Sequence, residues 1–290
     1  MNGIIVIDKP QGRTSHDMVS FMRRMTHIRR IGHTGTLDPM ATGVLPVCIG
    51  SATKAADMLT LSDKCYRAEL ILGKTTTTLD SEGEITGEFE VNVTENEIRA
   101  AIMSFVGEIE QIPPMYSAIK RDGKKLYELA REGVEIEREP RIVTINSIDI
   151  AEIDGGRIVI EVSCSKGTYI RTLCDDIGKK LGTGAYMSAL RRTKTGCFTL
   201  ENAYTLEQIE KMAAEGTLKA ALTSVDALFA GYDAIYLNEK QTRSIKNGVR
   251  MSWRGKQEGQ LLRLYDNNRQ FICVSRIEDE RLKLVKSFWS

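Results

Sequence analysis

The chain has 290 residues, and its 40 Lys and Arg residues against 39 Asp and Glu residues give a formal net charge of +1. This balance excludes a polycation, so a surface that binds an acidic partner must be a local patch, such as residues 231–290 with 12 basic and 7 acidic residues. The six cysteines show no CxxC or metal-ligand spacing and predict reduced thiols in a cytoplasmic protein. No apolar run reaches the roughly 18 residues of a membrane helix, and the apolar start lacks the basic region of a signal peptide.

Short apolar runs and capping residues predict alternating strands and helices in the first part of the chain. Residues 3–7 are β-branched and predict a strand that ends at a turn. Thr14 or Ser15 is placed to cap a helix, and Thr94 with Glu97 has the spacing of a capping box. The other elements expected here are strands at 44–49 and 64–72, a helix at 51–61, a polar loop or hairpin tip at 74–84 and a helix from 94 to about 105.

Residues 112–141 differ in character and predict a projecting insertion. Basic residues gather at 120–125 and at 138–141, on either side of a short helical stretch at 126–131. Such cationic tips are typical either of a solvated hairpin or of a surface that faces phosphates.

The remainder of the chain predicts more strands than helices. Three strand-like runs are expected, two of them joined by a hairpin turn at 154–156, and a helix follows that ends at Gly182. Strands near 187–191 and 197–200 and a helix at 205–214 come next. Residues 231–290 predict short strands separated by polar turns, which is typical of a small all-β module.

The stretch GHTGTLDPMATGVLP, residues 32–46, holds three glycines, two prolines and three threonines. This composition opposes a regular helix or a central strand and predicts a shaped loop with Asp38 in its middle. Pro39 biases Asp38 away from helical backbone angles. From the residues alone, Asp38 is either a turn or cap residue or a functional carboxylate. The stretch resembles the catalytic motif of the TruB family, the bacterial tRNA pseudouridine-55 synthases.

The resemblance implies that the chain isomerises uridine to pseudouridine at position 55 in the T-loop of tRNA. The reaction breaks the C1′–N1 bond and rejoins the uracil through C5, so it needs a carboxylate beside the sugar and base. The resemblance assigns this role to Asp38, stacking on the base to Tyr66 and pairing with the aspartate to Arg171. The sequence leaves open whether Asp38 attacks C1′ or C6 or takes the C2′ proton. The alternatives are that Tyr66 is an ordinary half-buried strand tyrosine and that Arg171 is a helix-surface arginine.

The same resemblance implies residues that bind RNA or support the site. His33 corresponds to a residue that helps to extrude the target uridine, and Leu190 to the apolar residue that packs under the base. Lys9 and Pro10 lie in a stretch similar to the family motif KPxGxTS and support the wall of the site. The insertion corresponds to an element that grips RNA. Its basic residues include Lys120, Lys124 and Arg141.

We therefore expect an α+β enzyme with the pseudouridine synthase fold, a mixed and mostly antiparallel sheet with flanking helices. Residues 1–230 form the catalytic domain with the insertion at about 112–141, and residues 231–290 form a PUA-like RNA-binding domain. No cofactor or metal is expected, because the reaction is redox-neutral and metal-ligand spacings are absent from the sequence. The expected partner is the T-arm of tRNA, with no obligate protein partner and no membrane. The alternative is a tRNA-binding RNA chaperone without catalysis, and a metal-dependent hydrolase lacks its ligands.

Overall fold

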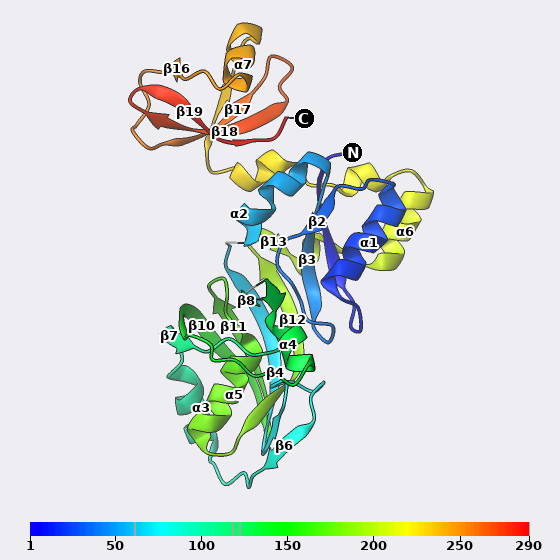
Figure 1. The fold of residues 1–290 in the computed structure, drawn as a ribbon, viewed down its shortest axis with the longest axis vertical. Coiled ribbons are helices and arrows are strands. Elements are labelled where there is room, and N and C mark those ends of the chain that lie inside the picture. Colours follow the sequence, from blue (N-terminus) through cyan, green and yellow to red (C-terminus); the bar gives the residue numbers. More distant parts are fainter. Residues whose placement is uncertain (61, 118, 122, 290) are drawn as a thin grey trace.

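The computed structural model describes residues 1–60, 62–117, 119–121 and 123–289. Three residues of predicted elements lie outside this part of the chain: Leu61, the expected end of a helix, and Ala118 and Asp122 in the expected insertion. Figure 1 shows an elongated molecule in which a large sheet with helices occupies most of the length and the C-terminal strands form a small lobe at one end. Strands and helices that share cores in this way make an α+β fold, as predicted.

The large sheet is mixed and mostly antiparallel, as the sequence predicts. In spatial order its strands are β14 (Ala203–Tyr204), β1 (Gly3–Lys9), β3 (Thr42–Ile49), β12 (Ala185–Thr195), β4 (Lys64–Leu72), β11 (Arg157–Cys164), β10 (Arg141–Asp154) and β7 (Gly107–Gln111). Two short strands extend it: β2 (Ile31–His33) pairs with β3, and β13 (Phe198–Thr199) pairs with β12. The parallel pairs are β1–β14 and β3–β12. The β3–β12 pair joins segments far apart in sequence beside the Asp38 loop.

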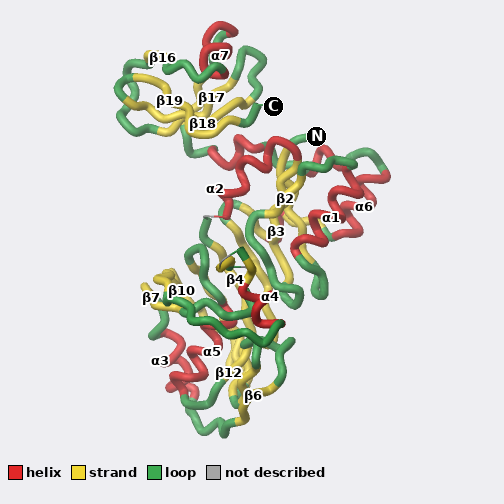
Figure 2. Tube along the Cα trace, viewed as in Figure 1, coloured by secondary structure: helices red, strands yellow, loops and turns green. Residues whose placement is uncertain are grey.

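Four helices cover one face of this sheet. They are α1 (Ser15–Thr26), α3 (Glu95–Met103), α5 (Ile170–Leu181) and α6 (Leu206–Ala214). Thr14, Thr94 and Thr205 cap α1, α3 and α6 through their side chains, because each hydroxyl accepts a backbone N–H of the first turn. Figure 2 shows α1 beside α6 and α3 beside α5. Their apolar faces join one core cluster with the sheet.

Strand β1 is buried on both faces, which explains its uninterrupted apolar sequence. Ile5 and Ile7 pack into the cluster under the helices, whereas Ile4 and Val6 point into a second cluster on the opposite face. That second cluster includes residues of η1 (Gly50–Ala55) and α2 (Ala56–Thr60), and it also includes Phe288 near the C-terminus. Residues of the small lobe therefore share one apolar cluster with the large sheet and with η1 and α2.

The prediction that residues 32–46 form only a loop is wrong at both ends, because β2 ends at His33 and β3 begins at Thr42. Gly43 has φ +101°, and a Cβ there would collide with the backbone carbonyl of Arg192 on β12, so this strand position needs glycine. Pro46 lies just beyond the last pair of β2 with β3, where its carbonyl accepts the Thr34 N–H at 3.1 Å and its missing N–H cannot extend the ladder. Residues 34–41 remain as the loop.

Residues 74–164 follow the predicted pattern except in the number of strands near the end of this range. The polar stretch at 74–84 leads into a hairpin of β5 (Lys74–Thr76) and β6 (Ile85–Glu88). The expected insertion contains β8 (Lys120–Arg121), β9 (Lys124–Lys125) and the predicted short helix α4 (Leu126–Arg131). The three strand-like runs are two strands, since irregularities of register within β10 interrupt its alternation without ending the strand.

The C-terminal lobe holds a five-stranded sheet but is not all-β. Its strands are β15 (Asp233–Tyr236), β17 (Leu261–Tyr265), β18 (Phe271–Glu278), β19 (Arg281–Ser287) and β16 (Met251–Ser252). The sequence analysis missed α7 (Glu239–Lys246), which buries only Thr242 and Ile245 and has a weak apolar pattern. The available signal was the capping box of Asn238 and Gln241. The 3₁₀ segment η2 (Leu200–Asn202) joins β13 to β14 within the large sheet, and η3 (Leu218–Ala221) and η4 (Val225–Phe229) lie between α6 and the C-terminal lobe.

Candidate active site

Buried side chains from distant elements fix the loop that carries Asp38. The Lys9 ammonium donates to the carbonyls of Pro39 at 3.2 Å and Ala41 at 2.7 Å. On α1, the Ser15 hydroxyl accepts the Leu37 N–H at 2.8 Å and donates to the Leu37 carbonyl at 3.1 Å. The loop backbone is thus held on both sides of Asp38, which gives the carboxylate a defined position.

Asp38 belongs to a charged cluster with Arg171 at its centre. Arg171, at the start of α5, places Nη2 3.4 Å from Asp38 Oδ2 and Nη1 3.2 Å from Asp80 Oδ2. The Arg171 and Asp80 side chains are only 6% and 2% exposed, whereas 34% of the Asp38 side chain remains exposed. Asp80 also accepts the Thr78 hydroxyl and the Glu82 N–H. Asp38 is therefore the carboxylate of the cluster that a substrate can reach.

Burial and the neighbouring charges shift the pKa of Asp38 in opposite directions. Burial raises the pKa of the Asp38 carboxyl, Arg171 and Lys9 act against this rise, and Asp80 adds to it. Burial likewise lowers the pKa of Lys9 to about 8, although the nearby Asp38 charge partly offsets that effect. Asp38 is therefore a carboxylate with a higher pKa than a surface aspartate, and the Arg171 cation lies beside it.

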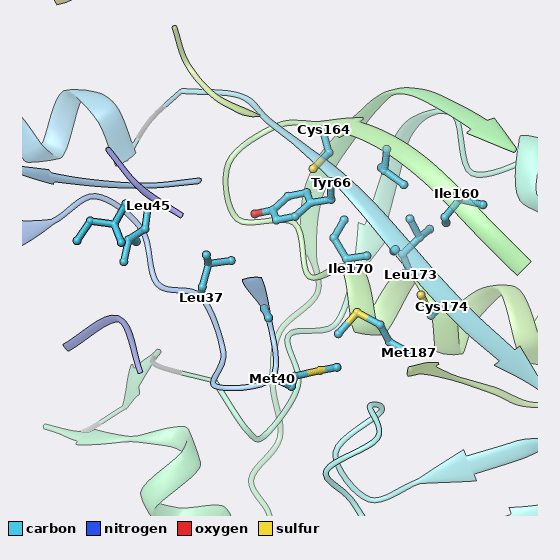
Figure 3. Packing of buried hydrophobic residues seen from close by; sticks show 14 of the residues in the cluster. Leu37, Met40, Leu45, Tyr66, Ile160, Cys164, Ile170, Leu173, Cys174 and Met187 are labelled. Carbon is cyan, nitrogen blue, oxygen red and sulfur yellow. The ribbon is translucent and has the colours of Figure 1, made fainter. Parts of the chain in front are cut away.

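An apolar wall lies beside the charged cluster. Tyr66 on β4 is 9% exposed and joins the same apolar cluster as Leu37 and Met40 of the Asp38 loop. In Figure 3 the Tyr66 hydroxyl points to the side on which Leu37 lies. Leu190 on β12 is half-buried and packs against this cluster. The structure thus brings an aromatic ring and apolar side chains together near the Asp38–Arg171 pair.

Comparison with known proteins shows which family the chain belongs to. The model of the TruB family pseudouridylate synthase N-terminal domain matches residues 23–170, which contain Asp38, Tyr66 and Asp80. The chain belongs to the TruB family. The model of the tRNA pseudouridylate synthase B C-terminal domain matches residues 171–230, and a further C-terminal model of pseudouridine synthase II TruB matches residues 234–283. The chain is accordingly a pseudouridine synthase.

Individual TruB relatives match nearly the whole chain. The tRNA pseudouridine synthase B of Clostridium kluyveri is 45% identical over 99% of this chain and 100% of its own length. The Clostridium perfringens (strain 13) enzyme is 44% identical over 99% of this chain and 98% of its own. The Alkaliphilus oremlandii enzyme is 57% identical over 73% of this chain and 71% of its own.

Chains in two solved complexes share the fold of this TruB chain. A Cbf5–Nop10–Gar1 complex contains a chain that matches with a TM-score of 0.74 and 25% identity, over 99% of this chain and 85% of that chain. An H/ACA RNP bound to a substrate RNA containing 2′-deoxyuridine matches with a TM-score of 0.73 at 23% identity, over 99% of this chain and 85% of that chain. The predicted pseudouridine synthase fold with a small PUA-like C-terminal domain is confirmed.

The other predicted site residues near the Asp38 loop of the TruB chain are Lys9, Pro10 and His33. Lys9 is fully buried and holds the loop through backbone carbonyls, and it also donates to the carbonyl of Pro10 at 2.9 Å. His33, at the end of β2, is half-buried, and its Nδ1 is buried without a hydrogen-bond partner. Burial, Arg192 and His16 all lower the pKa of His33, which favours the neutral imidazole. None of these three residues contacts Asp38 as Arg171 does.

The predicted RNA-contacting residues lie in and beside the insertion. Lys124 is exposed and lies 3.4 Å from Glu132 in a surface ion pair. Arg141 is exposed at the first position of β10. The backbone of Lys120 pairs with that of Lys125 between β8 and β9. Their roles in RNA binding stay predictions.

Sequence reasoning missed three residues that position the TruB site. Asp80 was assigned only to a turn, although it is the buried second carboxylate of Arg171. Arg192 is fully buried and donates to the carbonyls of Val44 at 2.7 Å and Gly35 at 3.2 Å, which ties β12 to the Asp38 loop. Gln111 binds the backbone at the start of α5. A charged residue in a threonine-rich turn was the only local signal for Asp80.

Metal sites and membrane-spanning helices are two other features that the structure can reveal. Within the ranges that the structure describes, no group of three or more His, Cys, Asp or Glu side chains is arranged to hold a metal ion. Of the helices formed by those residues, none has the length and apolar character to cross a membrane.

Proposed function

We propose that this pseudouridine synthase acts on uridine 55 in the T-loop of tRNA and that Asp38 is its catalytic carboxylate. The observation that carries the proposal is the Asp38–Arg171 pair, in which one carboxylate stays accessible while its cation is almost fully buried. The names of the tRNA pseudouridine synthase B relatives, aligned over nearly the whole chain, support a tRNA substrate.

The proposed chemistry needs an ionised Asp38. The C1′–N1 bond breaks, the uracil turns, a C1′–C5 bond forms, and the proton lost from C5 balances the one gained at N1. Asp38 acts either as a nucleophile on the nucleotide or as the base that takes the C2′ proton, and both routes start from the carboxylate. Arg171 favours that charged form. The reaction is redox-neutral and needs no cofactor.

The target uridine must leave the folded T-loop to reach Asp38. We assign stacking against the extruded uracil to Tyr66, contact beneath it to Leu190, and help with extrusion to His33. The half-buried position of Leu190 against the apolar wall supports its role, and the half-buried position of His33 at the end of β2, where the Asp38 loop begins, supports that of His33. A neutral His33 suits insertion among bases better than an additional desolvated charge.

RNA binding extends beyond the pocket in this proposal. Residues 1–230 act as the catalytic domain, their insertion grips the T-arm through Lys120, Lys124 and Arg141, and residues 231–290 add a basic RNA-binding surface. The six cysteines are free thiols, which supports a cytoplasmic location.

The test compares wild type with Asp38→Asn on an unmodified tRNA transcript. Pseudouridine is mapped by position, and tRNA binding is measured for both proteins. We expect wild type to modify position 55 and Asp38→Asn to bind tRNA with similar affinity but form no product. Product formation by Asp38→Asn at the wild-type rate would refute the role of Asp38, and modification at another position would refute the T-loop assignment.

A further inference from the structure

The side chain of Gln111 holds the residue from which α5 begins. Gln111 is the last residue of β7 and is 2% exposed. Its Oε1 accepts the Tyr169 N–H at 2.7 Å, and its Nε2 donates to the Tyr169 carbonyl at 3.0 Å. The amide thus binds both backbone groups of one residue, in the manner of a neighbouring strand.

This contact resembles one half of a capping box, in which a side chain accepts the N–H of the N-cap residue. Tyr169 is the N-cap residue, but its side chain makes no capping hydrogen bond. Its carbonyl accepts the Leu173 N–H at 3.1 Å, as expected for the start of a helix. Because Gln111 fixes Tyr169, it also fixes the direction in which α5 starts. Arg171 lies two residues further along.

The same segment also contacts the Arg171 side chain. Arg171 Nη2 donates to the carbonyl of Tyr116, five residues after Gln111. Arg171 Nε is buried without a hydrogen-bond partner, so the contacts of the two Nη atoms orient the guanidinium. A small rotation of the start of α5 would therefore move the Nη atoms of Arg171 away from Asp38, because no hydrogen bond at Nε holds the guanidinium in place.

We propose that Gln111 is a positioning residue for catalysis and sets the Arg171 guanidinium against Asp38 through the backbone of Tyr169. The inference rests on the proposed roles of Asp38 and Arg171. Removing the Gln111 amide leaves the N–H and carbonyl of Tyr169 without that partner in a buried setting, which favours a shifted start of α5. The chemical step is sensitive to such a shift, because displacements of about 1 Å lower rates by about 100-fold.

The first experiment uses Gln111→Met, which has a similar length and removes both hydrogen bonds. We expect its single-turnover rate at saturating tRNA to fall about 10- to 100-fold, with the dissociation constant for tRNA unchanged within about twofold. Val143→Ala is the matched control, since it shortens a buried side chain on β10, the strand next to β7, opposite Ile109. The thermal midpoint is measured for both variants. An equal loss of rate in Val143→Ala would overturn the positioning role.

The second experiment is a double-mutant cycle with Arg171→Met. If Gln111 acts through Arg171, then Gln111→Met has little further effect on the rate in the Arg171→Met background. A full additional loss there would show that Gln111 acts elsewhere. Asp38→Asn separates the two hypotheses: an active Asp38→Asn refutes the proposed function. An inactive Asp38→Asn together with a fully active Gln111→Met refutes only the inference about Gln111.

Discussion

Arg171→Met tests whether the charged cluster is organised around one cation. Methionine keeps much of the length of the side chain but leaves the two carboxylates with no guanidinium between them. Asp80 is the more costly of the two, because its side chain is 2% exposed, compared with 34% for Asp38. Asp80 keeps the Thr78 hydroxyl and the Glu82 N–H as donors.

These contacts set the expected magnitude. Removing one partner of a buried ion pair costs about 3–5 kcal/mol, mostly from the unpaired charge that remains. Because Asp80 keeps two donors and Asp38 keeps partial hydration, we expect the free energy of unfolding to fall by about 3 kcal/mol, the lower end of that range. Adding Asp80→Asn removes the unpaired buried charge, so the double variant should recover about half of the loss or more.

The assay is urea unfolding followed by far-UV circular dichroism, together with single-turnover pseudouridine formation. The double variant should be more stable than Arg171→Met and yet equally slow, because Asp38 still lacks its counter-ion. The reasoning is refuted if Arg171→Met unfolds within about 0.5 kcal/mol of wild type, a change typical of a surface substitution. It is equally refuted if Asp80→Asn destabilises the Arg171→Met protein further.

Two other predictions concern Lys9 and the basic residues of the insertion. Lys9→Met leaves the loop carbonyls of Pro39 and Ala41, and the carbonyl of Pro10, without the ammonium and should cost about 2 kcal/mol. The folded chain releases the Lys9 proton at about pH 8 and the unfolded chain near 10.5, so wild type should gain stability over Lys9→Met as pH rises through that window, and a flat difference would contradict the burial. Lys124→Ala and Arg141→Ala should each weaken tRNA binding and reduce the salt slope by about 1. Lys219→Ala serves as their surface control, and equal effects in all three would argue against the insertion.

Local signals in the sequence predicted most of the elements. The caps at Thr14, Thr94 and Thr205 depend on contacts with a residue three positions along the chain, so a short window contains the whole interaction. The β-branched run at the start of β1 and the glycine that ends α5 are equally local. The long motif around Asp38 is also contiguous, which is why the family resemblance was visible before the fold.

Only the tertiary structure decided how distant residues are placed around Asp38. Arg171 meets Asp80 across 91 residues, and Gln111 binds Tyr169 across 58. The strand order of the large sheet brings these segments together, and no residue pattern within a few positions of Asp80 or Gln111 specifies that order. The start of the strand at residue 42 instead of 44 has the same cause, because residue 43 must be glycine to lie against the backbone of Arg192. The sequence by itself determined the local elements and, through its resemblance to the TruB family, indicated Asp38 and Arg171 as a pair. The packing of distant strands determined how Arg171 reaches Asp38 and which residues support both.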